Sequence, residues 1–214
     1  MPTMKAFPTR ILAATLLVAA LSLSACGSSD SAGPEGEDAL LGMVRSPSLT
    51  VGEVELLDVS ETPPELVTMK APADGLYLIY FGYTSCPDIC PTTMSDLSVA
   101  MNDLPPDQAE RITVAMVTVD PDRDTPEVLA GYLGHFFEDP MPLRAADDAA
   151  LTKATEAFGV QFEVAEHEPG DTDYEVGHSA ITYVVDETGT VLVEWPFGFD
   201  SEQMTADLST ILGN

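Results

Sequence analysis

The sequence predicts an α/β fold in which helices flank a mixed central sheet. Residues 76–82 and 112–119 form continuous apolar runs, which are typical of strands buried on both faces. Apolar residues at helical spacing follow each run, and two apolar segments near the C-terminus flank a short loop that contains glycine. Parallel strands joined by crossover helices and closed by an antiparallel pair account for this order.

The N-terminal residues resemble an export signal. Lys5 and Arg10 form a basic start, and the apolar run at residues 11–23 is shorter than the ~20 residues that cross a bilayer. Small residues then precede Cys26, as in the lipobox of bacterial lipoproteins, where cleavage falls before a lipid-bearing cysteine. We therefore expect a cleaved signal peptide at residues 1–25 and an extracytoplasmic protein anchored to the cell membrane by a lipid on Cys26. The alternative is an ordinary secretory signal that ends beside a cysteine.

Composition separates the remainder into a tether and a domain. Residues 26–42 are rich in glycine, serine and acidic residues, which favours a flexible tether, and residues 43–214 are expected to form the folded domain. All 36 acidic residues but only six of the eight basic ones follow Cys26, so the processed chain carries a net charge of −30. Such a charge argues against nucleic acid or an anionic membrane surface as a partner.

The first half of the domain contains the two buried strands. Residues 48–59 show short apolar alternation and are expected to form a leading hairpin. The strand at 76–82 is followed by a cysteine motif and a predicted helix at 92–104. The second buried strand follows at 112–119.

The second half continues the alternation. Thr125 and Pro126 are a helix N-cap and first-turn proline, and they begin a helix with an apolar stripe that extends to Phe137. Another helix is predicted over 148–158, and a closing helix from about 201. The strands expected in this half are 180–185 and 191–195. This order of elements predicts a thioredoxin-like fold.

Cys86 and Cys90 are the cysteines that remain after Cys26. They lie between a buried strand and a helix, where the helix dipole and unpaired N–H groups lower the pKa of a thiol. The thiolate is both a nucleophile and a soft ligand that selects copper, especially Cu(I), or zinc. Three residues separate the pair, whereas thiol–disulfide oxidoreductases of this fold normally have two. A metal site, a redox pair and a structural disulfide are all compatible with this spacing.

A third ligand would have to come from one of three histidines. His135 lies among the apolar positions of its helix and is expected to be a solvated surface residue. His167 falls in an acidic loop and is expected to be exposed and mobile. His178 directly precedes a predicted strand, which holds an imidazole better than a loop does, and Gly177 beside it would permit an unusual backbone angle or a close approach.

Three motifs together resemble the Sco/SenC family of copper-binding assembly proteins. They are YTSCPDICP at residues 83–91, VDPDRDTP at residues 119–126, and GHS at residues 177–179. The similarity extends from about residue 43 to the C-terminus. It implies a thioredoxin-like fold and one copper ion per chain, Cu(I) or Cu(II), held by Cys86, Cys90 and His178.

The resemblance also implies a function and partners. It implies a metallochaperone that delivers copper to the dinuclear site of cytochrome c oxidase subunit II, with another extracytoplasmic copper chaperone as a further partner. The alternative is a thiol–disulfide oxidoreductase that keeps the cysteines of that site reduced. A peroxidase is disfavoured because Thr84 is only two residues before Cys86. We expect no enzymatic activity beyond such thiol reduction by the pair.

The family pattern bears on three further residues. Asp124 is implied to support the site or the partner surface, and the alternative is that it shapes the turn before the next helix. Many relatives carry an acidic residue where this chain has Gly177. Met94 lies one helical turn beyond Cys90 and offers a thioether, but a methionine on a helix stripe is more often a core residue.

Overall fold

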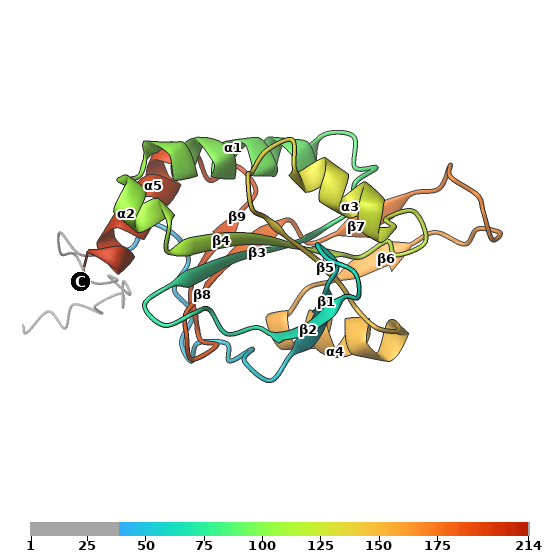
Figure 1. The fold of residues 1–214 in the computed structure, drawn as a ribbon, viewed down its shortest axis with the longest axis horizontal. Helices are drawn as coiled ribbons and strands as arrows, with labels where there is room; N and C mark the ends of the chain where they lie inside the picture. The colour runs from blue at the N-terminus through green and yellow to red at the C-terminus, as the bar shows by residue number, and fades with distance from the viewer. Residues whose placement is uncertain (1–38, 214) are drawn as a thin grey trace, which may run out of the picture. The chain divides into compact units, whose positions relative to one another are not determined.

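The computed structural model describes residues 39–213, which lie in the second of two units of the chain, Gly36–Asn214. Seven strands form one mixed sheet in the order β2-β1-β5-β4-β3-β8-β9, and β6 and β7 form a separate hairpin (Figure 1). β3, β4 and β5 are parallel, whereas β8, β9 and β1 are antiparallel to their neighbours. The strands are β1 (Glu55–Asp58), β2 (Glu65–Thr68), β3 (Leu76–Gly82), β4 (Ile112–Thr118), β5 (Met141–Arg144), β6 (Phe162–Val164), β7 (Val176–His178), β8 (Ile181–Val185) and β9 (Val191–Pro196).

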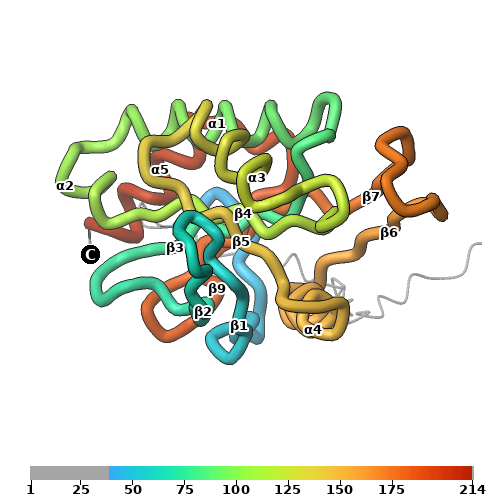
Figure 2. Tube along the Cα trace, turned by 45° about the vertical axis from the view of Figure 1, so that its right-hand side comes forward, coloured from blue at the N-terminus to red at the C-terminus, as the bar shows by residue number. Residues whose placement is uncertain are grey.

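Helices cover both faces of the large sheet. α1, α3 and α5 lie on one face and α4 lies on the other (Figures 1 and 2). Within residues 39–213, none of the helices has the length and apolar character needed to span a membrane. The helices are α1 (Ile89–Asp103), α2 (Pro106–Ala109), α3 (Pro126–Leu133), α4 (Asp148–Phe158) and α5 (Ser201–Leu212).

The predicted fold class is confirmed, and the two apolar runs form the centre of the sheet. Every residue of β3 is buried, and β4 is buried at all positions but one. Both runs have neighbours on either side in the sheet and helices on both faces, which explains why they are continuously apolar. The Thr125 side chain accepts a hydrogen bond from the Val128 amide, as expected of the N-cap of α3.

The boundaries of several elements differ from those predicted. The leading hairpin is formed by β1 and β2 rather than by residues 48–59, because Val51 and Val54 are buried in a turn instead of alternating along a strand. α1 begins at Ile89 rather than at Thr92. α3 ends at Leu133. The apolar stripe continues into the following turn, where Phe136 and Phe137 are partly buried.

Several short elements have no counterpart among the predicted ones. β5 has four residues and contains a proline, which counts against a strand in sequence patterns. β6 and β7 have three residues each, too few to show alternation. α2 is a single turn that begins at Pro106.

A buried carboxylate anchors the N-terminal segment of the domain to the sheet. Glu194 on β9 is almost fully buried and accepts two hydrogen bonds from Arg45, at 2.7 and 2.8 Å. The Arg45 side chain is 47% exposed, so solvent screens the pair on one side. Loss of the partner of a buried carboxylate destabilises a protein, because the charge then lacks both water and a compensating cation.

Removal of Arg45 should therefore destabilise the domain more than removal of an exposed cation. We expect Arg45→Ala to lower the free energy of unfolding by about 2 kcal/mol, less than for a fully buried pair, because water can reach Glu194 once the half-exposed arginine side chain is removed. Lys70→Ala is the control, because its partner Glu53 is 94% exposed and such a pair contributes at most ~1 kcal/mol. Urea unfolding of both variants measures the difference, and equal losses would contradict this account.

Candidate metal centre

The cysteine motif connects the end of β3 to the start of α1. Cys86 lies in the loop, and Cys90 is the second residue of the helix. The Cys90 amide donates a hydrogen bond to Cys86 Sγ at 3.4 Å, because first-turn amides have no partner within the helix. Both cysteines are free thiols in this structure.

The two thiols differ in exposure and acidity. Burial raises the pKa of the Cys90 thiol to about 12. Partial burial of Cys86 opposes ionisation, but hydrogen bonds from Cys90, the Asp88 amide and the Tyr83 hydroxyl outweigh it and lower its pKa. Cys86 is therefore the more accessible and more acidic thiol of the pair.

Selective alkylation should reveal this asymmetry. At pH 8, a pKa of about 12 leaves about one Cys90 in ten thousand ionised, and the side chain is fully buried. We expect iodoacetamide to modify Cys86 more than about tenfold faster than Cys90 in the reduced, metal-free protein. Peptide mass spectrometry measures both rates, with Cys86→Ser as the control in which Cys90 stays slow. Equal rates would contradict the assignment.

The Cys90 sulfur fits against a glycine of β3. A Cβ on Gly82 would lie 3.0 Å from Cys90 Sγ and 2.6 Å from the ring of Tyr80, so a side chain at this position would displace one of them. The Tyr80 hydroxyl, fully buried with its ring, donates to Cys90 Sγ at 3.7 Å. The buried sulfur therefore has a defined position.

The ring of His178 lies beside the Cys90 sulfur, although the two residues are 88 positions apart in the sequence. Its Nε2 lies 3.3 Å from Cys90 Sγ, and its Nδ1 lies 3.1 Å from the carbonyl oxygen of Ser179. Since a carbonyl oxygen only accepts, Nδ1 carries the proton and the Nε2 lone pair is free to face the cysteines. Burial lowers the pKa of the imidazole, which favours this neutral form. The rings of Tyr80 and Tyr83 contact it edge-on, with centroids 5.8 and 5.7 Å away.

The structure thus brings together the three side chains predicted from the sequence. Cys86 Sγ, Cys90 Sγ and a His178 ring nitrogen all lie within 4.8 Å of one another. A hollow of about 360 Å³ is lined by Cys86 and His178, together with Tyr83 and Ile89, but not by the buried Cys90. Two thiolates and one imidazole form a soft donor set that suits Cu(I) and also accommodates Cu(II).

Asp124 lies behind the cysteine loop rather than in this cluster. It is fully buried and accepts hydrogen bonds from the Thr84 amide at 3.1 and 3.2 Å, from the Thr84 hydroxyl at 2.5 Å and from the Thr118 hydroxyl at 2.6 Å. Burial raises the pKa of this carboxyl, although these hydrogen bonds oppose the shift. Asp124 therefore fixes the residues that lead into Cys86.

Other residues considered from the sequence take no part in the cluster. His135 is exposed, as predicted, and Met94 is buried in the core. The prediction for His167 was wrong: its side chain is 16% exposed and stacks on Tyr174 with centroids 3.7 Å apart. The expectation for Gly177 was also wrong, because it lacks a positive φ and a Cβ at this position would meet nothing within 4 Å. Cys26, the predicted lipidation site, lies outside the described residues.

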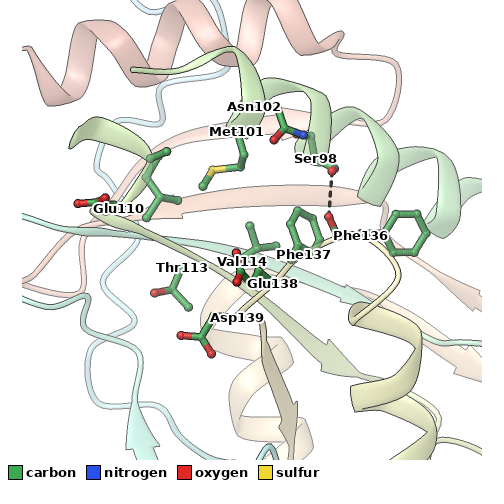
Figure 3. A pocket seen from close by; sticks show the side chains of 12 residues that line it. Ser98, Met101, Asn102, Glu110, Thr113, Val114, Phe136, Phe137, Glu138 and Asp139 are labelled. Atoms are coloured by element: carbon green, nitrogen blue, oxygen red, sulfur yellow. Dashed lines mark hydrogen bonds between the residues drawn. The ribbon is translucent and has the colours of Figure 1, made fainter. Parts of the chain in front are cut away.

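A second hollow lies away from the cysteines. It has a volume of about 450 Å³ and is lined by α1, β4 and the segment that follows α3, including Met101 and Phe137 (Figure 3). Carboxylates of Glu110, Glu138 and Asp139 are among its polar groups. None of the clustered thiol and imidazole groups lines it, so the candidate chemistry belongs to the other hollow.

The family follows from comparison with known proteins. A family model described as SCO1/SenC matches residues 45–213. The chain belongs to the SCO1/SenC family. Among SCO1/SenC relatives, a SCO2-like protein of Rickettsia prowazekii is 38% identical over 138 residues, which are 64% of this chain and 65% of that protein. The chain therefore spans just under two thirds of the length of this relative.

Solved structures of SCO1/SenC proteins share the fold. The apo Sco1 protein from Thermus thermophilus has a TM-score of 0.68 and 30% identity, with 81% of this chain and 97% of that chain covered. ScoI of Bradyrhizobium japonicum, solved with copper bound, has a TM-score of 0.61 and 30% identity, with coverage of 75% and 98%. The thioredoxin-like fold predicted from the order of elements is confirmed by these likenesses.

Sequence reasoning does not reveal the groups around the cluster. Tyr80 belongs to a continuous apolar run, where nothing in the pattern distinguishes a residue that hydrogen-bonds a sulfur from a core residue. Tyr83 and Thr84 stand out in the sequence only as parts of the motif. Arg123 and Tyr174 lie in polar loops, and their mutual contact could not be foreseen without the fold.

Proposed function

We propose that this protein is an extracytoplasmic copper metallochaperone that binds one copper ion through Cys86, Cys90 and His178 and delivers it to the dinuclear site of cytochrome c oxidase. The observation that carries the proposal is the convergence of two thiols and a neutral imidazole from distant parts of the chain. A redox pair has no need of that histidine, whereas copper in either oxidation state benefits from a nitrogen ligand.

The position of the site suits transfer to another protein. Cys86 is partly exposed and lines the hollow, whereas Cys90 is buried. An acceptor thiolate could approach from the Cys86 side and replace the ligands of the ion one after another. Cytochrome c oxidase subunit II is the proposed acceptor, and another extracytoplasmic copper chaperone is the proposed donor.

The second candidate function is a thiol–disulfide oxidoreductase that keeps the acceptor cysteines reduced. The asymmetry of the pair favours it, because an accessible thiol of lowered pKa beside a buried one suits attack on a disulfide followed by resolution.

Substitution of the histidine distinguishes the two functions. His178→Ala removes the nitrogen ligand and leaves both thiols, so a chaperone loses copper transfer while a reductase keeps its activity. The measurements are copper transfer from the loaded protein to a metal-free subunit II domain, and oxidase activity in cells that express the variant alone. Oxidase activity at the wild-type level, together with lost copper transfer, would favour the reductase and contradict the chaperone.

The location at the membrane is a separate part of the proposal. We expect a lipid on Cys26 and a tether between the membrane and the domain. The predicted tether bounds of 26–42 extend too far, because the amides of Leu41 and Gly42 donate hydrogen bonds to the buried Asp207 and so belong to the folded domain. Cys26→Ser should leave the protein uncleaved and unlabelled by a fatty-acid probe, whereas the unsubstituted chain takes up the label. Labelling that is unaffected by the substitution would contradict lipidation at this residue.

A further inference from the structure

The loop between β4 and α3 contacts both halves of the candidate site. Through Asp124 it holds Thr84 and so the loop that carries Cys86. Two of its other residues, Asp120 and Arg123, contact the segment that leads into β7, which carries His178. One short loop therefore contacts both the loop that carries Cys86 and the segment that leads to His178.

Arg123 makes the connection to the histidine side. Its Nε donates to Asp120 Oδ2 at 2.5 Å, and its Nη1 donates to the carbonyl oxygens of Thr172 and Tyr174 at 3.2 and 3.1 Å. The side chain is only 10% exposed. A guanidinium offers several donors in a fixed plane, so these bonds hold the backbone of residues 172–174 at a set distance from the loop.

Tyr174 is the group that receives these contacts. Its hydroxyl donates to Asp120 Oδ1 at 2.5 Å. The Arg123 Cζ atom and the centroid of the His167 ring each lie 3.7 Å from the centroid of the tyrosine ring, a separation at which they must occupy opposite faces. His167 in turn lies 3.2 Å from Asp122 through Nε2. The tyrosine ring is held from both faces and at its hydroxyl.

The hairpin that carries His178 needs such support. β6 and β7 pair with each other in a sheet of their own, at three positions, and not with the main sheet. A two-stranded hairpin is at best marginally stable alone, and residues 165–175 connect its strands. Tyr174 lies four residues before His178, so a displacement at the tyrosine changes the position of the imidazole.

We propose that Arg123 and Tyr174 are positioning residues that hold His178 at ligand distance from the cysteine pair. This inference rests on the proposed copper site, but the support itself is a property of the metal-free protein. Tyr174 acts through the backbone of the hairpin, whereas Arg123 acts through that backbone and through the ring of Tyr83, whose centroid lies 5.6 Å from its Cζ atom.

The first test uses Arg123→Lys, which keeps a positive charge beside Asp120 and loses the planar stack and the paired donors. We expect the affinity for Cu(II), measured by competition with a chromophoric chelator, to fall about 10- to 100-fold. In a His178→Ala background, the same substitution should cause no further loss of copper affinity. Equal losses with and without the histidine would overturn the proposal, because they would show a general effect on the site.

Arg111→Lys is the matched control. Arg111 also donates to two backbone carbonyl oxygens, those of Asp74 and Leu212, at 2.6 and 3.0 Å, but it contacts neither the hairpin nor the cysteine loop. We expect wild-type copper affinity for this variant. Tyr174→Phe is a second variant at the support: it keeps the ring and loses the bond to Asp120, so it should weaken copper binding in the same direction as Arg123→Lys but by less.

Hydrogen exchange separates this inference from the proposed function. In the metal-free protein, amides of residues 162–164 and 176–178 should exchange faster in Arg123→Lys and Tyr174→Phe than in the wild type or in Arg111→Lys. If the variants exchange faster but the protein binds no copper, the role of Arg123 and Tyr174 in holding the β6–β7 hairpin is supported and the proposed copper site is refuted. Unchanged exchange in both variants would overturn the proposal that Arg123 and Tyr174 hold the hairpin, whether or not the protein binds copper.

Discussion

Substitution of either Cys86 or Cys90 by serine is expected to abolish copper binding. The hydroxyl of serine is a hard, protonated group at neutral pH and does not replace a thiolate toward Cu(I). The remaining thiol and His178 would leave a two-ligand site, in which the ion is readily lost to a chelator. We expect copper content after loading and desalting to fall from one ion per chain to the background level.

Two controls separate ligation from packing. Met94→Leu removes the thioether nearest to Cys90 in sequence but keeps its volume in the core, so it should retain full copper content. Ser85→Ala changes an exposed neighbour of Cys86 and should also bind normally. Full copper content in either cysteine variant, measured by elemental analysis against protein concentration, would refute ligation by that thiol.

Asp124→Ala is expected to have the largest effect on stability. The carboxylate accepts hydrogen bonds from the Thr84 amide and from the hydroxyls of Thr84 and Thr118, all in a buried setting. Alanine leaves these donors without an acceptor, and each buried unsatisfied group is costly. We expect a loss of about 3 kcal/mol in the free energy of unfolding, measured in urea, together with weaker copper binding because the cysteine loop loses its support. Asp103→Ala, an exposed carboxylate at the end of α1, should change stability by less than ~0.5 kcal/mol.

The pH dependence of Asp124→Asn has a definite sign. Because burial raises the pKa of Asp124 above its ordinary value of 3.8, the pH-dependent part of its contribution to stability is fully present below pH 3.8 and is lost as the pH rises through the raised pKa. Asparagine does not titrate, so the difference between wild type and Asp124→Asn should be smaller at pH 7 than at pH 4.5. A difference that grows toward neutral pH would contradict the raised pKa.

The centre of the fold could be predicted because it is built from long, continuous patterns. β3 and β4 are apolar throughout, and α3 begins with an N-cap and a proline that mark its start. β5, β6 and β7 have three or four residues each, and their pairing depends on tertiary contacts rather than on local pattern. The same limit explains why the pattern favours a leading hairpin at residues 48–59 instead of at β1 and β2.

The candidate ligands could be predicted for a different reason. Cys86 and Cys90 are chemically rare and lie at a strand–helix junction, where their properties follow from local geometry. The prediction of His178 as a ligand depended on the family resemblance. Nothing within the sequence indicates that Cys90 and His178, 88 positions apart, lie with Sγ and Nε2 at 3.3 Å from each other. The anchor formed by Arg123 and Tyr174 joins two polar loops, which carry no periodic signal at all.

X-ray absorption spectroscopy of the copper-loaded protein tests the central claim most directly. The site geometry predicts two sulfur scatterers and one nitrogen scatterer around each copper ion, with the nitrogen lost in His178→Ala and both sulfurs retained. A first shell that is the same in the wild type and in His178→Ala would contradict the three-ligand site, since the imidazole would then contribute nothing to the bound ion.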